Sequence, residues 1–291
     1  MRILNFGSLN IDYVYLLDHF VRPGETLSSE EFFLDSGGKG LNQSIALAHA
    51  GVQVYQAGMI GKDGEFLKEI LNENGVDTQY IETIDEPTGN AIIQVDKKGQ
   101  NCIILFGGAN HKITSEYINK VFSSFNKGDY IVLQNEINCM DLIIKKAKEK
   151  EMIVVFNPAP MSREVHLYPL ELVDILIVNE VEGEELSGEK EPEKIIEKLL
   201  SDLPKTAVIL TLGENGSIYA DKTKRISCSV GKNVKVIDTT AAGDTYIGYF
   251  VAMITTGKSV KDAMKIASKA CDICVSKSGA AETIPYLQAL I

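Results

Sequence analysis

Short apolar runs alternate with longer helix-like patterns along most of this chain. The runs are rich in β-branched residues and predict buried strands at Ile3 to Phe6, Val54 to Ile60, Tyr130 to Gln134, Met152 to Phe156, Ile175 to Val178 and Ala207 to Leu212. The intervening patterns predict helices at Asn42 to Ala50, Glu65 to Glu73, Ser115 to Phe125, Met140 to Lys150, Pro192 to Ser201, Asp244 to Thr256 and Val260 to Ser276. This alternation predicts an α/β fold with a mostly parallel central sheet covered by helices on both faces.

Two segments interrupt the alternation. Tyr13 to Phe33 and Gly89 to Phe106 are typical of antiparallel strands, and the second contains a Lys97-Lys98-Gly99 turn. Because the two segments flank the first strand–helix unit, we expect a small separate sheet, a lid of residues 11–36 and 89–106. The core would then consist of residues 1–10, 37–88 and 107–291. Such a lid, apolar and rich in edges, is suited to cover an active site and to pair with a second subunit.

Composition limits the classes of function. A chain of 291 residues with 45% hydrophobic and 24% charged residues is suited to one large α/β core with an appendage. The net charge of -11 argues against a nucleic-acid or anionic-membrane surface. The first residues are typical of a strand and not of a signal peptide, and the five cysteines, an odd number, suit reduced thiols. We therefore expect a cytoplasmic protein with small-molecule partners.

Several familiar motifs are incomplete. Cys271 and Cys274 form a C-x-x-C inside a helical pattern with no second pair, which favours packing over zinc or redox chemistry. The four histidines show no triad or metal-ligand spacing. Gly257-Lys258-Ser259 lacks the first glycine of a P-loop, and Gln43 replaces the last glycine of a dinucleotide fingerprint. Metal hydrolases, P-loop enzymes and dinucleotide dehydrogenases are therefore disfavoured.

The segment Asp238 to Asp244 favours phosphoryl transfer. Its residues Ala241, Ala242 and Gly243 have almost no side chain and stand where a helix begins. First-turn amides lack acceptors within a helix, so together with the helix dipole they attract a phosphate. Asp244 beside them would serve as a general base toward a hydroxyl. The alternative is a plain helix start in which Asp244 only complements the dipole.

Polar residues near other predicted strand ends suggest a sugar site. They are Asn10 and Asp12 after the first strand, Lys39 and Asn42 after a glycine turn, and Glu136 after Tyr130 to Gln134. Each alone is more often a turn or cap residue. Ligand sites of parallel sheets gather at the carboxyl ends of strands, and mixed donors and acceptors suit sugar hydroxyls. Their matched locations therefore favour one binding site.

Two ordered signatures resemble a known family. Gly37-Gly38-Lys39-Gly40-Leu41-Asn42-Gln43-Ser44, with Gly51 and Gly61, resembles the first signature of the ribokinase (PfkB-type) carbohydrate kinases, and Asp238 to Gly248 resembles the second. The resemblance covers nearly the whole chain and includes Gly7 to Asp12, Pro23 to Thr26, Asn157 to Pro160, Asn179 to Glu182 and Thr211 to Gly216. It implies a three-layer α/β sandwich with a β lid, dimerised through that lid.

The resemblance also implies residue roles for an ATP-dependent enzyme that phosphorylates the 5-hydroxyl of D-ribose. Asp244 would be the base, and Ala241, Ala242 and Gly243 the anion hole. The implied substrate-binding residues are Asn10, Asp12, Gly38, Lys39, Asn42, Glu136 and Asp244. Those implied for ATP are Asn179, Glu182, Thr211, Gly213 and Gly216, with Glu182 reaching Mg²⁺ through water. Asp238, Thr240 and Gly279 would hold an activating K⁺.

Two residues depart from the family pattern and leave alternatives open. Tyr249 stands where the second signature has a small residue, and Ile247 stands where asparagine is usual. The alternatives are a kinase of the same fold for another substrate, such as fructose, a nucleoside or a keto-sugar acid, and a non-catalytic sugar or nucleotide sensor. The base at Asp244 argues against the sensor, because binding alone requires no base there.

Overall fold

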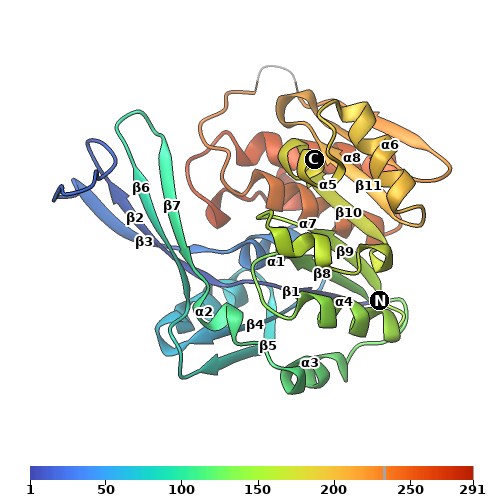
Figure 1. The fold of residues 1–291 in the computed structure, drawn as a ribbon, viewed down its shortest axis with the longest axis horizontal. Helices are drawn as coiled ribbons and strands as arrows, with labels where there is room; N and C mark the ends of the chain where they lie inside the picture. The colour runs from blue at the N-terminus through green and yellow to red at the C-terminus, as the bar shows by residue number, and fades with distance from the viewer. Residues whose placement is uncertain (232–233, 291) are drawn as a thin grey trace.

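A nine-stranded sheet forms the centre of the molecule (Figure 1). The computed structural model describes residues 1–231 and 234–290. The strands, in sheet order, are β13 (Arg225–Cys228), β12 (Ser217–Ala220), β11 (Ala207–Thr211), β10 (Ile175–Asn179), β9 (Ile153–Asn157), β8 (Tyr130–Gln134), β1 (Ile3–Phe6), β4 (Val54–Gly61) and β5 (Asp77–Ile84). From β11 to β5 every neighbouring pair is parallel, and β12 and β13 extend the sheet antiparallel. The predicted α/β fold with a mostly parallel sheet is confirmed.

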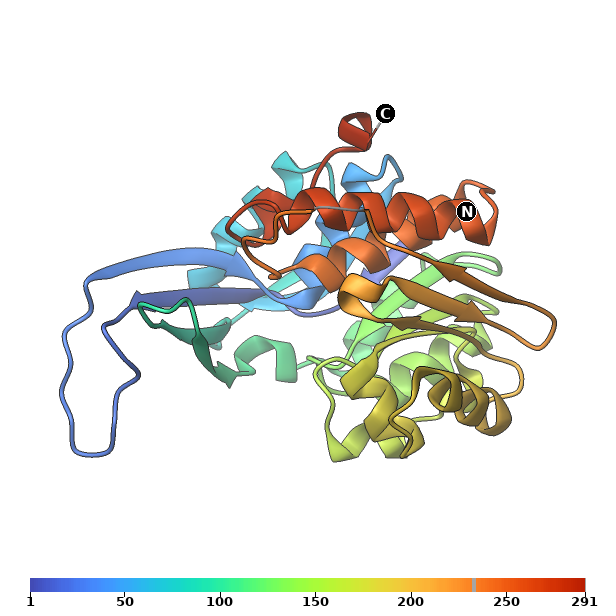
Figure 2. The same cartoon turned by 90° about the horizontal axis from the view of Figure 1, so that it is seen from above.

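Helices cover both faces of this sheet (Figure 2). They are α1 (Lys39–His49), α2 (Glu65–Glu73), α3 (Ser115–Phe122), α4 (Met140–Glu149), α5 (Glu180–Ser187), α6 (Pro192–Asp202), α7 (Ala242–Thr255) and α8 (Val260–Cys274). Side chains of α1, α2, α7 and α8 join one buried cluster, and those of α3, α4 and α6 join the other. Neighbouring strand residues such as Ile3 and Leu4 belong to opposite clusters, as alternating side chains require. Within the described residues, no helix is long and apolar enough to cross a bilayer.

A separate four-stranded sheet extends from the core, to the left in Figure 1. Its order is β3 (Glu31–Gly37), β2 (Asn10–Leu16), β6 (Gly89–Val95) and β7 (Asn101–Phe106). The pairs β2–β3 and β6–β7 are antiparallel as predicted, but β2 and β6 are parallel. The purely antiparallel expectation was wrong because β2 follows β1 and β6 follows β5. Both therefore leave the carboxyl edge of the main sheet in the same direction.

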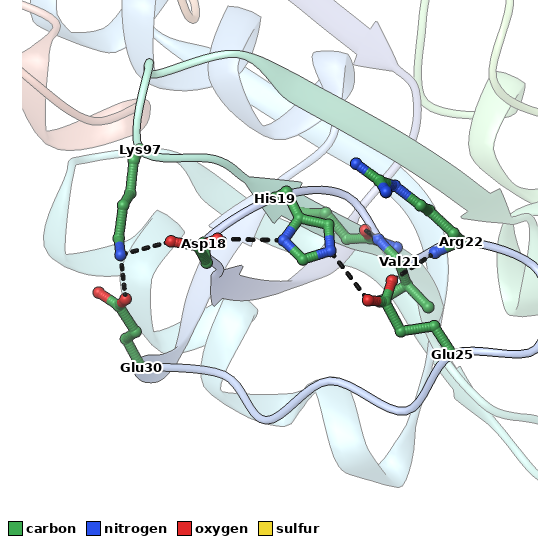
Figure 3. Close-up of polar contacts among 8 residues, drawn as sticks. Asp18, His19, Val21, Arg22, Glu25, Glu30 and Lys97 are labelled. Carbon is green, nitrogen blue, oxygen red and sulfur yellow. Dashed lines mark hydrogen bonds and ion pairs between the residues drawn. The ribbon is translucent and has the colours of Figure 1, made fainter.

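Exposed ion pairs join the far end of this lid sheet (Figure 3). The Lys97 ammonium lies 2.5 Å from Asp18 Oδ1 and 3.0 Å from Glu30 Oε1. His19 lies between Asp18 and Glu25, at 3.1 and 3.0 Å. Hydrogen bonding to Asp18, and then to Glu25, raises the pKa of His19. Exposed ion pairs contribute little to the free energy of folding, so the main effect of these contacts is to orient the loop between β2 and β3.

Several element boundaries differ from the sequence prediction. Helix α1 begins three residues early, at Lys39, because Gly38 as N-cap has φ 93, a left-handed conformation that glycine adopts without strain. Helix α7 begins at Ala242, two residues before the predicted start at Asp244. Helix α3 ends at Phe122, three residues before the predicted end at Phe125. The prediction missed β5, β12, β13 and α5. Strand β5 is mostly half-exposed or exposed, and α5 is short and rich in glutamate, so neither has a strong apolar pattern.

Candidate active site

A cavity of about 700 Å³ lies between the lid sheet and the carboxyl ends of the central strands. Residues from both sheets line it. It brings together most of the residues that the sequence singled out, namely Asn10, Asp12, Gly38, Lys39, Asn42, Glu136, Asn179, Glu182, Thr211, Asp238, Thr240, Ala241, Gly243, Asp244 and Gly279. Segments far apart in the sequence thus meet at one place, as the strand-end argument predicts.

Three of the predicted site residues do not line the cavity. Ala242 has a small side chain inside the first turn of α7, and its amide donates to Thr239 O at 3.2 Å. Gly213 begins a short 3-10 helix after β11. Gly216 has φ 92 in the turn between β11 and β12, and a Cβ there would lie 2.0 Å from Cys228 O, so its missing side chain lets the end of β13 approach this turn.

The first turn of α7 presents free amides to the cavity. Its N-cap, Ala241, adopts a left-handed φ of 58, which is uncommon for a residue other than glycine, and no side chain caps the helix. Within residues 1–231 and 234–290, the amides of Gly243 and Asp244 have no acceptor. A Cβ on Gly243 would meet nothing within 4 Å. The turn therefore offers two donors and open space to an anion.

Asp244 is buried, with 7% of its surface exposed, and both of its carboxylate oxygens accept a hydrogen bond from α1. Asn42 Nδ2 donates to Oδ2 at 3.2 Å, and Gln43 Nε2 donates to Oδ1 at 2.9 Å. Helices α1 and α7 pack closely at Gly248, where a Cβ would lie 2.4 Å from the Ala46 Cβ. Gln43 stood in the first signature but was given no role.

The end of the cavity near the lid carries three carboxylates. Asp12 on β2 lies opposite Asp35 on β3 in the strand register, and Glu136 accepts from the Lys39 amide at 2.9 Å. Burial, followed by the charges of Asp35 and Glu136, raises the pKa of Asp12 to about 7. Burial, followed by the charge of Glu282, raises the pKa of Asp35. Sequence reasoning missed Asp35, although a lone acid before Gly37 in an apolar run was an available signal.

Glu182 lies at the opposite end of the cavity and closes the start of α5. Its amide donates to Asn179 Oδ1 at 2.8 Å, and its Oε2 accepts from the Asn179 amide at 2.9 Å, which makes a capping box. Asn157 also lines the cavity, although the resemblance gave it no role, and its Nδ2 donates to the same Glu182 oxygen at 3.2 Å. Burial raises the pKa of Glu182 despite these donors.

Lys39 supplies the positive charge between the acidic groups. The charge of Asp244 raises the pKa of the Lys39 ammonium against the opposing effect of burial. Glu136 and Glu182 raise it further. The ammonium group of Lys39 therefore experiences the charges of Asp244, Glu136 and Glu182 together.

The loop before α7 is held by Asp238. Its Oδ1 accepts from the Thr240 amide at 2.9 Å and from Thr240 Oγ1 at 2.7 Å, and its Oδ2 accepts from the Gly279 amide at 3.1 Å. Burial opposes the charge, but these hydrogen bonds outweigh burial and lower the pKa of Asp238. The carboxylate is thus ionised and joins the loop to the segment after α8.

The comparison with family models decides the class of protein. The model of the pfkB family carbohydrate kinases matches residues 2–287. This chain belongs to the pfkB family of carbohydrate kinases. Among the family's proteins, the ribokinase of Haemophilus influenzae is 36% identical over 294 residues, 97% of this chain and 94% of that protein. The ribokinase of Staphylococcus aureus is 36% identical over 299 residues, 99% of this chain and 97% of that protein.

Solved structures of the pfkB family share the fold along its whole length. The ribokinase of Cryptococcus neoformans var. grubii, in complex with ADP, has a TM-score of 0.87 and 37% identity, with 99% of this chain and 98% of that one covered. The Arabidopsis thaliana ribokinase complexed with ribose and ATP has a TM-score of 0.88 and 28% identity, with 99% and 97% covered. A nucleoside kinase of Methanocaldococcus jannaschii, at 22% identity and a TM-score of 0.80, shares the fold alone.

The two departures from the pfkB signatures have different consequences. Tyr249 is fully buried on the far side of α7, and its hydroxyl donates to Pro285 O, so it packs the helix without lining the cavity. Ile247 lines the cavity one turn after Asp244. Only the second departure changes the surface that a ligand meets.

Proposed function

We propose that this pfkB-family kinase transfers the γ-phosphoryl group of ATP to the 5-hydroxyl of D-ribose, with Asp244 as the general base. The observation that carries the proposal is the α7 start, where a buried carboxylate lies beside the free amides of Gly243 and Asp244 in one cavity. Similarity to ribokinases along the whole chain supports ribose as the acceptor.

The chemistry is an in-line displacement. Asp244 takes the hydroxyl proton, the hydroxyl oxygen forms a bond to the γ-phosphorus, and the bond to the leaving ADP oxygen breaks. A positioned general base contributes about 10²- to 10⁴-fold to such a step. The free amides and Lys39 stabilise charge that spreads over the transferring group, which is the main requirement of phosphoryl transfer.

Sugar hydroxyls would bind at the lid end of the cavity, through Asn10, Asp12, Gly38, Lys39, Asn42 and Glu136. The Oδ1 atom of Asn42 supports this assignment, because it is buried and has no hydrogen-bond partner within the described residues. Buried polar atoms are rarely left unpaired, so a ligand hydroxyl is a suitable donor. The carboxylates of Asp12, Asp35 and Glu136 also disfavour a keto-sugar acid, whose own charge they would repel.

Residues at the α5 end suit Mg²⁺ held through water and phosphate oxygens. No cluster of three or more His, Cys, Asp or Glu side chains suited to a metal ion occurs within residues 1–231 and 234–290. Mg²⁺ usually keeps several waters and needs only one or two carboxylates, so Glu182, oriented by Asn179, fits it. Bound there, the ion would neutralise phosphate charge. Thr211 lines the same end, and Gly213 and Gly216 shape the adjoining turn for ATP.

K⁺ activation is proposed for the loop of Asp238, Thr240 and Gly279. The ionised Asp238 carboxylate and the backbone around it suit a monovalent cation, which would help to orient the neighbouring α7 amides. The hydrogen bonds to Thr240 and Gly279 already order part of this loop, so we expect the ion to raise turnover and not to be needed for folding.

A homodimer through the lid is also proposed. Phe32, Leu34, Ile92, Ile104 and Phe106 are 40 to 58% exposed and alternate along their strands with residues that line the cavity. They therefore form an apolar face away from the ligand, and apolar patches of this kind mark interaction sites.

The cytoplasm stays our prediction for the location of the protein. The free thiols of Cys102, Cys139, Cys228, Cys271 and Cys274 are consistent with it.

The deciding experiment is a panel of acceptors with MgATP, read by ADP release. It includes ribose, fructose, a keto-sugar acid, adenosine and no acceptor, each in potassium, sodium and tetramethylammonium chloride at matched ionic strength. We expect the highest kcat/KM for ribose, a ribose 5-phosphate product by NMR, and faster turnover in potassium. Preference for another acceptor would support a different same-fold kinase, and no turnover with any acceptor would support a sensor. Equal rates in the three salts would reject the cation site.

A further inference from the structure

A chain of buried amide side chains lies beneath the cavity and ends on Asp244. Its members are Asn5 on β1, Gln134 on β8 and Gln43 on α1, and all three are completely buried. Gln134 Nε2 donates to Asn5 Oδ1 at 2.8 Å and to Gln43 Oε1 at 2.7 Å. Gln43 Nε2 then donates to Asp244 Oδ1 at 2.9 Å. Two strands of the central sheet are thus connected to the proposed base through one helix residue.

The orientation of every amide in this chain follows from a backbone carbonyl at its far end. Gly40 O can only accept, so Asn5 must present its nitrogen there, at 2.6 Å. The Asn5 oxygen then faces Gln134, which must donate to it. The Gln134 nitrogen donates its second hydrogen to the Gln43 oxygen. The nitrogen of Gln43 therefore points toward Asp244. A carboxylate can accept this hydrogen bond but would repel an amide oxygen.

One polar atom of these three amides, on Gln134, remains without a hydrogen-bond partner. Gln134 Oε1 is buried and has no hydrogen-bond partner in the part of the chain that the structure describes. Leaving a buried acceptor unpaired is costly. Rotating the Gln134 amide by 180° would lose the hydrogen bonds to both Asn5 and Gln43. The observed orientation therefore keeps these two hydrogen bonds and leaves one acceptor atom unpaired. Gly7 leaves the space for it, because a Cβ there would lie 2.0 Å from Gln134 Oε1.

We propose that Gln43, oriented by Gln134 and Asn5, is a positioning residue that aims the Asp244 carboxylate at the acceptor hydroxyl. The inference rests on the proposed role of Asp244 as base. With Asn42 on Oδ2 and Gln43 on Oδ1, each oxygen of the carboxylate has one donor from α1, which fixes the plane of the group. Proton transfer needs this alignment, and a misplacement of about 1 Å can cost about 10²-fold in rate.

The test replaces each of the two glutamines by the similarly shaped methionine. Gln43→Met should lower kcat about 10- to 100-fold at saturating ribose and MgATP, while both KM values change less than about twofold, because alignment and not binding is lost. Gln134→Met acts one residue further away and should lower kcat less. The matched control is Thr206→Val, which removes a buried hydrogen bond to Val173 O at the opposite edge of the sheet and should leave kcat unchanged.

Thermal unfolding of all variants separates positioning from stability. A fall in kcat that follows the order Gln43, Gln134, Thr206, regardless of the loss in Tm, supports the proposal. A Gln43→Met enzyme with kcat within twofold of the parent, beside an inactive Asp244→Asn enzyme, would overturn the positioning role and leave the base intact. A fully active Asp244→Asn enzyme would instead reject the base itself. Falls in kcat that track Tm in all three variants would also overturn the proposal.

Discussion

Helices α5 and α7 both begin at the carboxyl edge of the central sheet, and both carry an acidic residue at their third position, each 7% exposed. In α5, Glu182 folds back onto its own N-cap, Asn179, and the two satisfy each other. In α7 the N-cap is Ala241, with no side-chain cap, and Asp244 turns to α1 instead. A helix start that caps itself is closed, whereas one that does not leaves amides free for a ligand.

The largest expected effect comes from the acid of the open helix start. Asp244→Asn keeps the shape of the side chain but removes the proposed base, so kcat should fall at least about 100-fold while ribose affinity barely changes. Steady-state kinetics and calorimetry measure the two quantities. Turnover near the parent rate at saturating substrates would end the contrast between the two helices, because Asp244 would then be only a dipole partner.

A second change gives α7 the residue that α5 has at its second position. Gly243→Val copies Val181, which is 64% exposed on α5. The new side chain would project into the cavity at the proposed place of the phosphoryl group, so kcat should fall about 100-fold, comparable to the loss of one oxyanion donor. Because a Cβ there meets nothing within 4 Å, Tm should change little. An active Gly243→Val enzyme would place the transferring group elsewhere.

A smaller effect is expected at the closed helix start. Glu182→Gln should raise the Mg²⁺ concentration that gives half-maximal turnover by about tenfold, the lower range for losing a group that orients a metal and its waters. Titration of activity with Mg²⁺ at fixed ATP measures it, and Glu184→Gln on the same helix is the control. An unchanged Mg²⁺ requirement would mean that Glu182 serves α5 only as a cap.

The smallest effect concerns stability. Asn179→Ala gives α5 the N-cap residue of α7, and it should lower the free energy of unfolding by about 1 kcal/mol, the usual cost of losing such a cap. Urea denaturation measures the change. Ser259→Ala is the control at α8, where another side chain caps a helix by accepting from the Asp262 amide. A loss at Ser259 but not at Asn179 would show that the capping box contributes nothing to stability.

The fold was largely predictable from the sequence where burial is complete. Strands such as β1 and β8 are buried along their full length, so their apolar runs stand out. Strand β5 consists mostly of half-exposed or exposed residues, and the short helix α5 has few apolar residues, so a pattern search misses both. The direction of β2 relative to β6 depends on where each leaves the main sheet, which no local pattern encodes.

For the site, the sequence by itself determined the residue types and their approximate location, because small residues, a helix start and strand ends are local properties. Only the tertiary structure decided which groups touch Asp244. Gln43 is 201 residues away and reaches it because α1 and α7 pack closely at Gly248. Asp35 joins Asp12 only through the β2–β3 register, and Gly216 lies in the turn before β12 without lining the cavity. Contacts between distant segments depend on packing distances, and these are set by the whole fold.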